Sequence, residues 1–199
     1  VTLDVAQERV HQWREAGDRE RLRATLLEEA VFSELYEQDE NALVDHWLWR
    51  NRHRYRDIEQ AYEAVVFGWK NGANQFNLGL FLRLLGIRGR VTERLHRSAL
   101  EAYQNLMGEE HPDTLRSVSN LADLLCEKGD YEAAEPLYRR ALEGREQVLG
   151  SQHPAALDSV NNLALLLSNK GDYEAAESLH RRALEGCETA LGAQHSQTL

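Results

Sequence analysis

The chain has 199 residues, of which 42% are hydrophobic and 28% are charged, a composition typical of a folded domain and not of a disordered chain. The formal charge of −10 would repel polyphosphate and argues against a general nucleic-acid binder. No apolar run approaches the roughly 20 residues that a membrane span needs, and no secretory leader is recognisable. Neither Cys126 nor Cys187 has metal-ligand spacing, so we expect reduced thiols in a cytoplasmic protein.

Residues 1–70 are predicted to form a degenerate helical-hairpin region. The stretch EAGDRERLRATLL, at 15–27, has the order helix, Gly-Asp, helix, and the residues that follow keep apolar side chains at helical spacing. All four tryptophans and all four phenylalanines lie before residue 82, so we expect larger side chains in this part of the core. The alternative is an independently folded domain.

The segment GDRERLRATLLEEAVFSELYEQDENALVDHW, at 17–47, resembles the helical linker that joins the ATPase to the repeats in bacterial NACHT/NB-ARC and nephrocystin-like proteins. The resemblance implies an ATPase domain in the parent protein, against which this chain could pack. The sequence departs from that pattern at WRNRHRYRD, which we interpret as an inserted or extended loop.

That loop carries a dense run of positive charge, with Trp49 and Tyr55 interleaved. Such a run could bind an anion, a nucleic acid or a protein partner. The interpretation we favour is a solvated loop after a helix, because the C-terminal end of a helix dipole favours cations. The possible anion patch consists of Arg50, Arg52, Arg54 and Arg56.

The rest of the chain repeats with a period of 42 residues. The heptapeptide GDYEAAE occurs at 129–135 and again at 171–177. A third copy of the 42-residue repeat begins with HSQTL at 195, in register with the repeats that begin at His111 and His153. Because the chain starts without methionine and stops inside this motif, we expect a piece of a larger protein. Each copy is predicted to be two helices: a histidine-proline pair opens the first, and glycine-aspartate forms the turn to the second.

The order of small and aromatic residues in each copy resembles the tetratricopeptide repeat (TPR) signature, and its residues are Leu121, Ala122, Tyr131, Ala134, Tyr138 and Ala141. The 42-residue period, with LYRRALE and LG..HP, resembles the subtype found in kinesin light chains. The resemblance implies an all-α fold, a right-handed superhelical solenoid of antiparallel helix hairpins.

An earlier, less regular copy precedes these two. ERLHRSALEAYQNLMGEEHP aligns with the second helix at an offset of 42, and NLGLFLRLLG aligns with the first at an offset of 43. The turn IRGRV therefore holds one extra residue. We predict a TPR array over 71–199, with repeats at about 71–110, 111–152 and 153–194 and a truncated start at 195–199.

No catalytic motif is present: the sequence lacks a G-x-x-x-x-G-K-[ST] phosphate loop, an H-E-x-x-H zinc motif and a G-x-S-x-G elbow. His111, His153 and His195 share the 42-residue spacing. Equivalent residues of neighbouring repeats lie about 10 Å apart, whereas zinc needs its ligands at about 2 Å. We therefore expect cap residues, and predict no enzyme activity, no metal and no cofactor.

The TPR resemblance implies that the first helix of each repeat lines a concave groove, with six positions facing a ligand. In one repeat these positions are Arg116, Ser119, Asn120, Asp123, Cys126 and Glu127. In the next they are Asp158, Asn161, Asn162, Leu165, Ser168 and Asn169, and Asn77 is the counterpart of Asn120 in the earlier copy.

The shared asparagines suggest peptide binding, because an amide both donates and accepts and can hold a peptide backbone. They could instead bridge adjacent helices. Arg116 is the only cation among the groove positions, opposite Asp123, Glu127 and Asp158, so a neutral or basic ligand fits better than an acidic one.

The sequence as a whole predicts a non-enzymatic protein-protein interaction module, the sensor or scaffold portion of a larger bacterial NTPase-type signalling protein. Two alternatives are a regulatory array of a protease-type effector, and nucleic-acid or anion binding through the arginine run.

Overall fold

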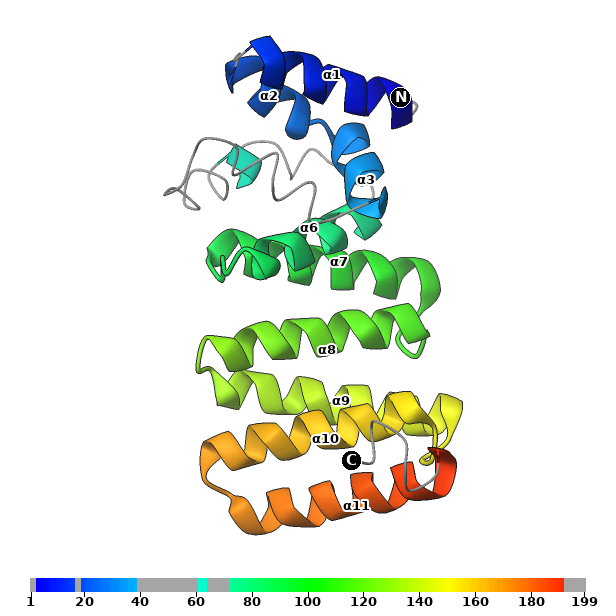
Figure 1. Cartoon of the computed structure of the whole chain (residues 1–199). Helices are drawn as coiled ribbons and strands as arrows, with labels where there is room; N and C mark the ends of the chain where they lie inside the picture. The colour runs from blue at the N-terminus through cyan, green and yellow to red at the C-terminus, as the bar shows by residue number, and fades with distance from the viewer. Residues whose placement is uncertain (1–2, 17–18, 39–60, 64–71, 192–199) are drawn as a thin grey trace. The chain divides into compact units, whose positions relative to one another are not determined.

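The structure, a computed structural model, describes residues 3–16, 19–38, 61–63 and 72–191 (Figure 1). The described residues form helices and no strand, which confirms the all-α prediction. The Arg50–Arg56 run and the truncated repeat at 195–199 lie outside them. The helices are α1 (Leu3–Ala16), α2 (Arg19–Leu26), α3 (Glu29–Gln38), α6 (Gly72–Leu84), α7 (Arg90–Met107), α8 (Pro112–Glu127), α9 (Tyr131–Leu149), α10 (Pro154–Lys170) and α11 (Tyr173–Leu191).

The chain divides into two compact units, Val1–Ala99 and Leu100–Leu199. None of the described helices is both long enough and apolar enough to cross a membrane. The predicted boundary between a degenerate region and a repeat array, at residue 70, stays a prediction.

The first unit packs around aromatic side chains, as the distribution of phenylalanine and tryptophan predicted. The ring of Phe32 meets the rings of Tyr62 and Phe81 edge-on, with centroids 5.8 Å and 5.9 Å apart. All three side chains are fully buried. The Tyr62 hydroxyl donates to the carbonyl oxygen of Leu26 at 3.2 Å, so the one polar atom of this cluster is satisfied.

The second unit contains two complete hairpins, α8–α9 and α10–α11, built around one apolar core. Small residues bring the helices together: Ala134 and Ala141 of α9 are fully buried. At Gly144 an added Cβ would lie 2.6 Å from Cδ2 of Leu115 on α8, too close for any larger side chain without a shift. The turn between α8 and α9 needs Gly129, whose φ of +81° is a conformation that favours glycine.

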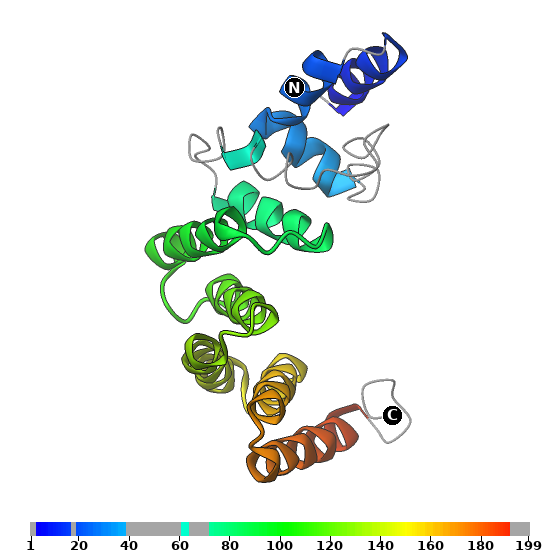
Figure 2. The same cartoon turned by 90° about the vertical axis from the view of Figure 1, so that its left-hand side faces the viewer.

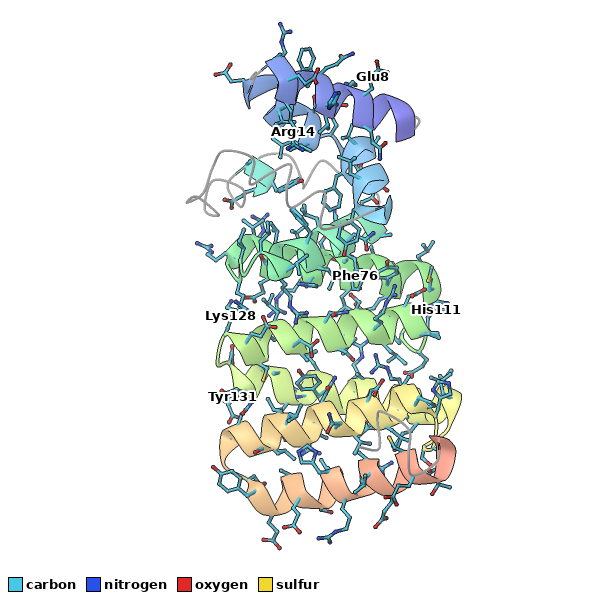
Figure 3. All side chains as sticks on the ribbon, in the orientation of Figure 1. Glu8, Arg14, Phe76, His111, Lys128 and Tyr131 are labelled. Atoms are coloured by element: carbon cyan, nitrogen blue, oxygen red, sulfur yellow. The ribbon has the colours of Figure 1, made fainter. Side chains whose placement is uncertain are left out.

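The caps predicted from the histidine-proline pairs are confirmed. Nδ1 of His111 accepts from the backbone N–H of Asp113 at 3.2 Å, and Nδ1 of His153 accepts from that of Ala155 at 3.1 Å. Asp130 caps α9 in the same way, accepting from the N–H of Ala133 at 3.2 Å. Figure 3 shows His111 and Lys128 at opposite ends of α8.

Replacing His153 with alanine should remove its cap and lower the free energy of unfolding by about 1 kcal/mol. Replacing it with asparagine should retain the stability, because the amide oxygen accepts the same hydrogen bond. Urea unfolding followed by circular dichroism measures both variants. An equal loss in both would mean that this imidazole does not act as a cap.

Candidate functional site

The predicted ligand-facing positions lie on the first helices of the two hairpins. α8 and α10 turn one side into the core, where Leu121 and Leu163 are almost fully buried, and their polar residues lie on the other side. Figure 2 shows α8 and α10 to one side of α9. Nδ2 of Asn169 lies 3.9 Å from Sγ of Cys126 and joins the two helices directly. We call the twelve groove positions of these helices the α8–α10 face.

The structure exposes half of the α8–α10 face fully. The exposed residues are Arg116, Glu127, Asp158, Asn161, Leu165 and Asn169. Five residues are half-buried: Asn120, Asp123, Cys126, Asn162 and Ser168.

Two predicted residues stand apart from this set. Ser119 is only 6% exposed, and its hydroxyl donates to the carbonyl oxygen of Leu115 at 3.2 Å, so its side chain is directed into its own helix. Asn77 is half-buried on α6, in the first unit.

Second helices also reach this face, which the sequence reasoning missed. The Tyr138 hydroxyl of α9 donates to Oδ1 of Asp123 at 2.6 Å. In the next hairpin, Nδ1 of His180 lies 2.9 Å from Oδ1 of Asn161. Residues 138 and 180 are 42 positions apart, so equivalent positions hold different side chains beneath the face.

Arg145 of α9 contacts α10 beside this face. Its Nη1 donates to Oγ of Ser159 at 2.5 Å and lies 3.5 Å from the carbonyl oxygen of Ala155. Burial lowers the pKa of the Arg145 guanidinium, while the negative charges of Asp158 and Asp123 act in the opposite direction. A half-buried cation thus lies within electrostatic range of one carboxylate from each first helix.

The side chains of this face are mostly polar. Burial raises the pKa of the Cys126 thiol, which disfavours the reactive thiolate. Within the described residues, no group of three or more histidine, cysteine or acidic side chains could hold a metal ion. Besides that thiol, the face carries amides, carboxylates, serine hydroxyls, the guanidinium of Arg116 and one exposed leucine, which suit hydrogen bonding, ion pairing and apolar contact.

Ion pairs fasten α10 to α9 next to the face. Nζ of Lys170 lies 2.7 Å from Oε2 of Glu135 and 3.0 Å from Oε1 of Glu132. Hydrogen bonds from Lys170 and then from Arg139 lower the pKa of the Glu135 carboxyl. The same contacts, first with Glu135, raise the pKa of Lys170.

The comparisons with known proteins decide the family. The sequence profile described as "Tetratricopeptide repeat" matches residues 73–147 and 116–189, which together cover more than half of the chain. The chain belongs to the tetratricopeptide repeat family. Repeats of this family indicate a scaffold for protein-protein interaction and are generally non-catalytic. No curated protein matches the sequence.

Solved structures agree with the TPR solenoid. BtubC (BKLC) of P. vanneervenii superposes with a TM-score of 0.61 at 20% identity, over 99% of this chain and 75% of that one. A Podosopora anserina protein, described as a kinesin light chain with nearly identical TPR-like repeats, superposes with a TM-score of 0.63 at 16% identity. The match covers 95% of this chain and 96% of that one. The MamA protein superposes with a TM-score of 0.53 at 12% identity, over 98% of this chain and 96% of that one. At these identities the likeness shows the fold alone.

Replacing Lys170 with glutamine should lower the melting temperature at neutral pH. Because the folded pKa of Glu135 is depressed, the stability it contributes is present above its unfolded pKa and is lost as the pH falls through the folded value. The difference from the unmodified protein should therefore close below roughly pH 4. Thermal unfolding between pH 7 and 3 measures this.

The matched control is Arg181→Gln, which removes an exposed ion pair with Glu177 on α11. It should change the melting temperature less, because exposed pairs within one helix contribute little. A pH-independent loss in the Lys170 variant would contradict the assignment.

Proposed function

We propose that this chain is a non-enzymatic protein-interaction module that holds an extended polypeptide segment along the α8–α10 face. The observation that carries this is the stripe on α10 formed by Asp158, Asn161, Leu165 and Asn169. All four are exposed, and they recur at helical spacing on one side of the helix. A folded module that presents such a stripe beside a second helix of the same kind offers a peptide several anchor points.

Asn120 and Asn162 are the proposed backbone contacts, because they keep the same amide at the same place in both repeats. Nδ2 of Asn120 donates to the carbonyl oxygen of Arg116 at 3.0 Å, which orients the amide along its own helix. An oriented side chain loses less conformational entropy on binding. Amides placed in this way favour a ligand whose backbone donates and accepts in turn.

The charge of the face supports a neutral or basic ligand. Nη2 of Arg116 lies 2.9 Å from Oδ1 of Asp113, so the positive charge of Arg116 is balanced by a carboxylate of the same helix. Asp123, Glu127 and Asp158 contribute three carboxylates to the face, and Arg145 offsets part of the negative charge of Asp158 and Asp123. An acidic peptide would meet like charge, which costs affinity.

The wider setting is a separate proposal. We propose that the module is the sensor or scaffold portion of a larger bacterial NTPase-type signalling protein in the cytoplasm, which the resemblance of 17–47 to an ATPase linker supports. A phosphate-loop motif encoded upstream would agree with this setting, whereas a paired cysteine and histidine in a neighbouring domain would favour a protease-type effector.

Binding through the Arg50–Arg56 run stays a competing prediction. Titration with short DNA and RNA at two salt concentrations tests it, because phosphate contacts weaken steeply as salt rises.

The double variant Asn120→Ala, Asn162→Ala should weaken peptide binding about tenfold, the loss expected for two hydrogen bonds. Its melting temperature should stay close to that of the unmodified chain. The measurement selects peptides from a random twelve-residue library on the unmodified chain and compares the dissociation constants.

The control is Asn105→Ala, Gln147→Ala, which removes two exposed amides from the second helices α7 and α9. It should bind as the unmodified chain does. If the first pair loses stability and binding together, the amides are structural and the proposed contact is wrong.

A further inference from the structure

The two complete repeats differ mainly on the face and agree at most core positions. Residues 111–152 and 153–194 differ at 13 of 42 positions. In the first helix, five of the six face positions differ, against two of the ten others. The five differing pairs are Arg116 and Asp158, Ser119 and Asn161, Asp123 and Leu165, Cys126 and Ser168, and Glu127 and Asn169.

Packing explains the agreement but not the differences. The core positions must be filled by side chains of the same volume in both hairpins, because cores tolerate little change in size. The five differing face pairs include all six exposed residues of the α8–α10 face. The second-helix residues that contact the face also differ between the repeats. Tyr138 of α9 donates to Asp123, whereas its equivalent in α11, His180, lies beside Asn161. Each repeat therefore presents its own chemistry on a common backbone.

The sharpest contrast lies at two neighbouring turns of the first helices. α8 carries Asp123 and Glu127, four residues apart on one side of the helix, where they form a paired negative charge. At the same places α10 carries Leu165, which is 50% exposed, and the uncharged Asn169. One half of the face suits a cation and the other an apolar group.

We infer that the ligand is a single asymmetric peptide, with a lysine or arginine against Asp123 and Glu127 and an aliphatic side chain against Leu165. This rests on the proposed function and adds the identity of the ligand's side chains. Equivalent positions of adjacent repeats are about 10 Å apart, one helix diameter. An extended chain rises about 3.3 Å per residue and its side chains alternate between two sides. Two side chains that both reach the face therefore stand two or four residues apart.

The experiment uses an array of twelve-residue serine-glycine peptides, each with one lysine and one leucine, two lysines, or two leucines. The spacing varies from one to six residues, and both orders of lysine and leucine are present. Binding of the full chain is compared with two exchange variants that give one repeat the residues of the other. The variants are Asp123→Leu with Glu127→Asn, and Leu165→Asp with Asn169→Glu.

The control exchange is Pro136→Ser with Gln147→Thr, which also copies second-repeat residues into the first, but on α9 away from the face. Circular dichroism and the melting temperature verify that all three variants fold. The unmodified chain and the control should prefer one lysine and one leucine at a spacing of two or four, because only even spacings put both side chains on one side of an extended peptide. The first exchange should shift the preference to two leucines and the second to two lysines, each by about three- to fivefold, with the lysine preference falling as salt rises.

Folded exchange variants that keep the preference of the unmodified chain would overturn the inference. The proposed function would still stand in that case if the Asn120, Asn162 variant lost binding. The unmodified chain could also bind no peptide of the array and yet bind library-selected peptides through the two asparagines. That result would reject the lysine-leucine ligand and leave the proposed function standing. Binding that neither the asparagines nor the exchanges affect would reject both.

Discussion

The close approach of the two helices within each hairpin is the constraint on which the second unit depends. Ala134 and Ala141 are fully buried, and at Gly144 an added Cβ would lie 2.6 Å from Cδ2 of Leu115 of α8. With that side of each first helix committed to its partner, the polar stripe can only lie on the opposite side. The site is thus a consequence of packing, because the same helix that fills the core presents the face.

Much of the fold could be predicted from the sequence, because the repeat supplies several local signals that agree. Proline after histidine marks where α8 and α10 begin, and glycine followed by aspartate marks the turn between the helices of a hairpin. One helix boundary could not be predicted from the sequence. α2 ends at Leu26 and α3 begins at Glu29, although the helical spacing of apolar residues continues through that point. Periodicity reports which side of a helix is apolar and does not reveal a change in its direction.

The candidate site was predictable in part. The TPR resemblance placed its positions on the first helices, but it treated equivalent positions as equal, whereas Ser119 is buried and Asn161 is exposed. The roles of Tyr138, His180 and Arg145 escaped the sequence, because these residues belong to second helices and reach the face across the hairpin. Which way they point depends on how two helices cross, and no spacing within one helix contains that information.

Near-identity of the hairpins also has a consequence for folding. α9 and α11 share most of their apolar residues, although Tyr138 and Val148 of α9 correspond to His180 and Ala190 of α11, so α8 could in principle pair with either one. Separation along the sequence favours the pairing of α8 with α9. Only residues 128–130 separate α8 from α9, whereas α11 begins one whole repeat later. Closing the short loop costs less entropy and is faster. The brevity of the Lys-Gly-Asp turn, shared by both hairpins, thereby protects a duplicated sequence from mispairing with itself.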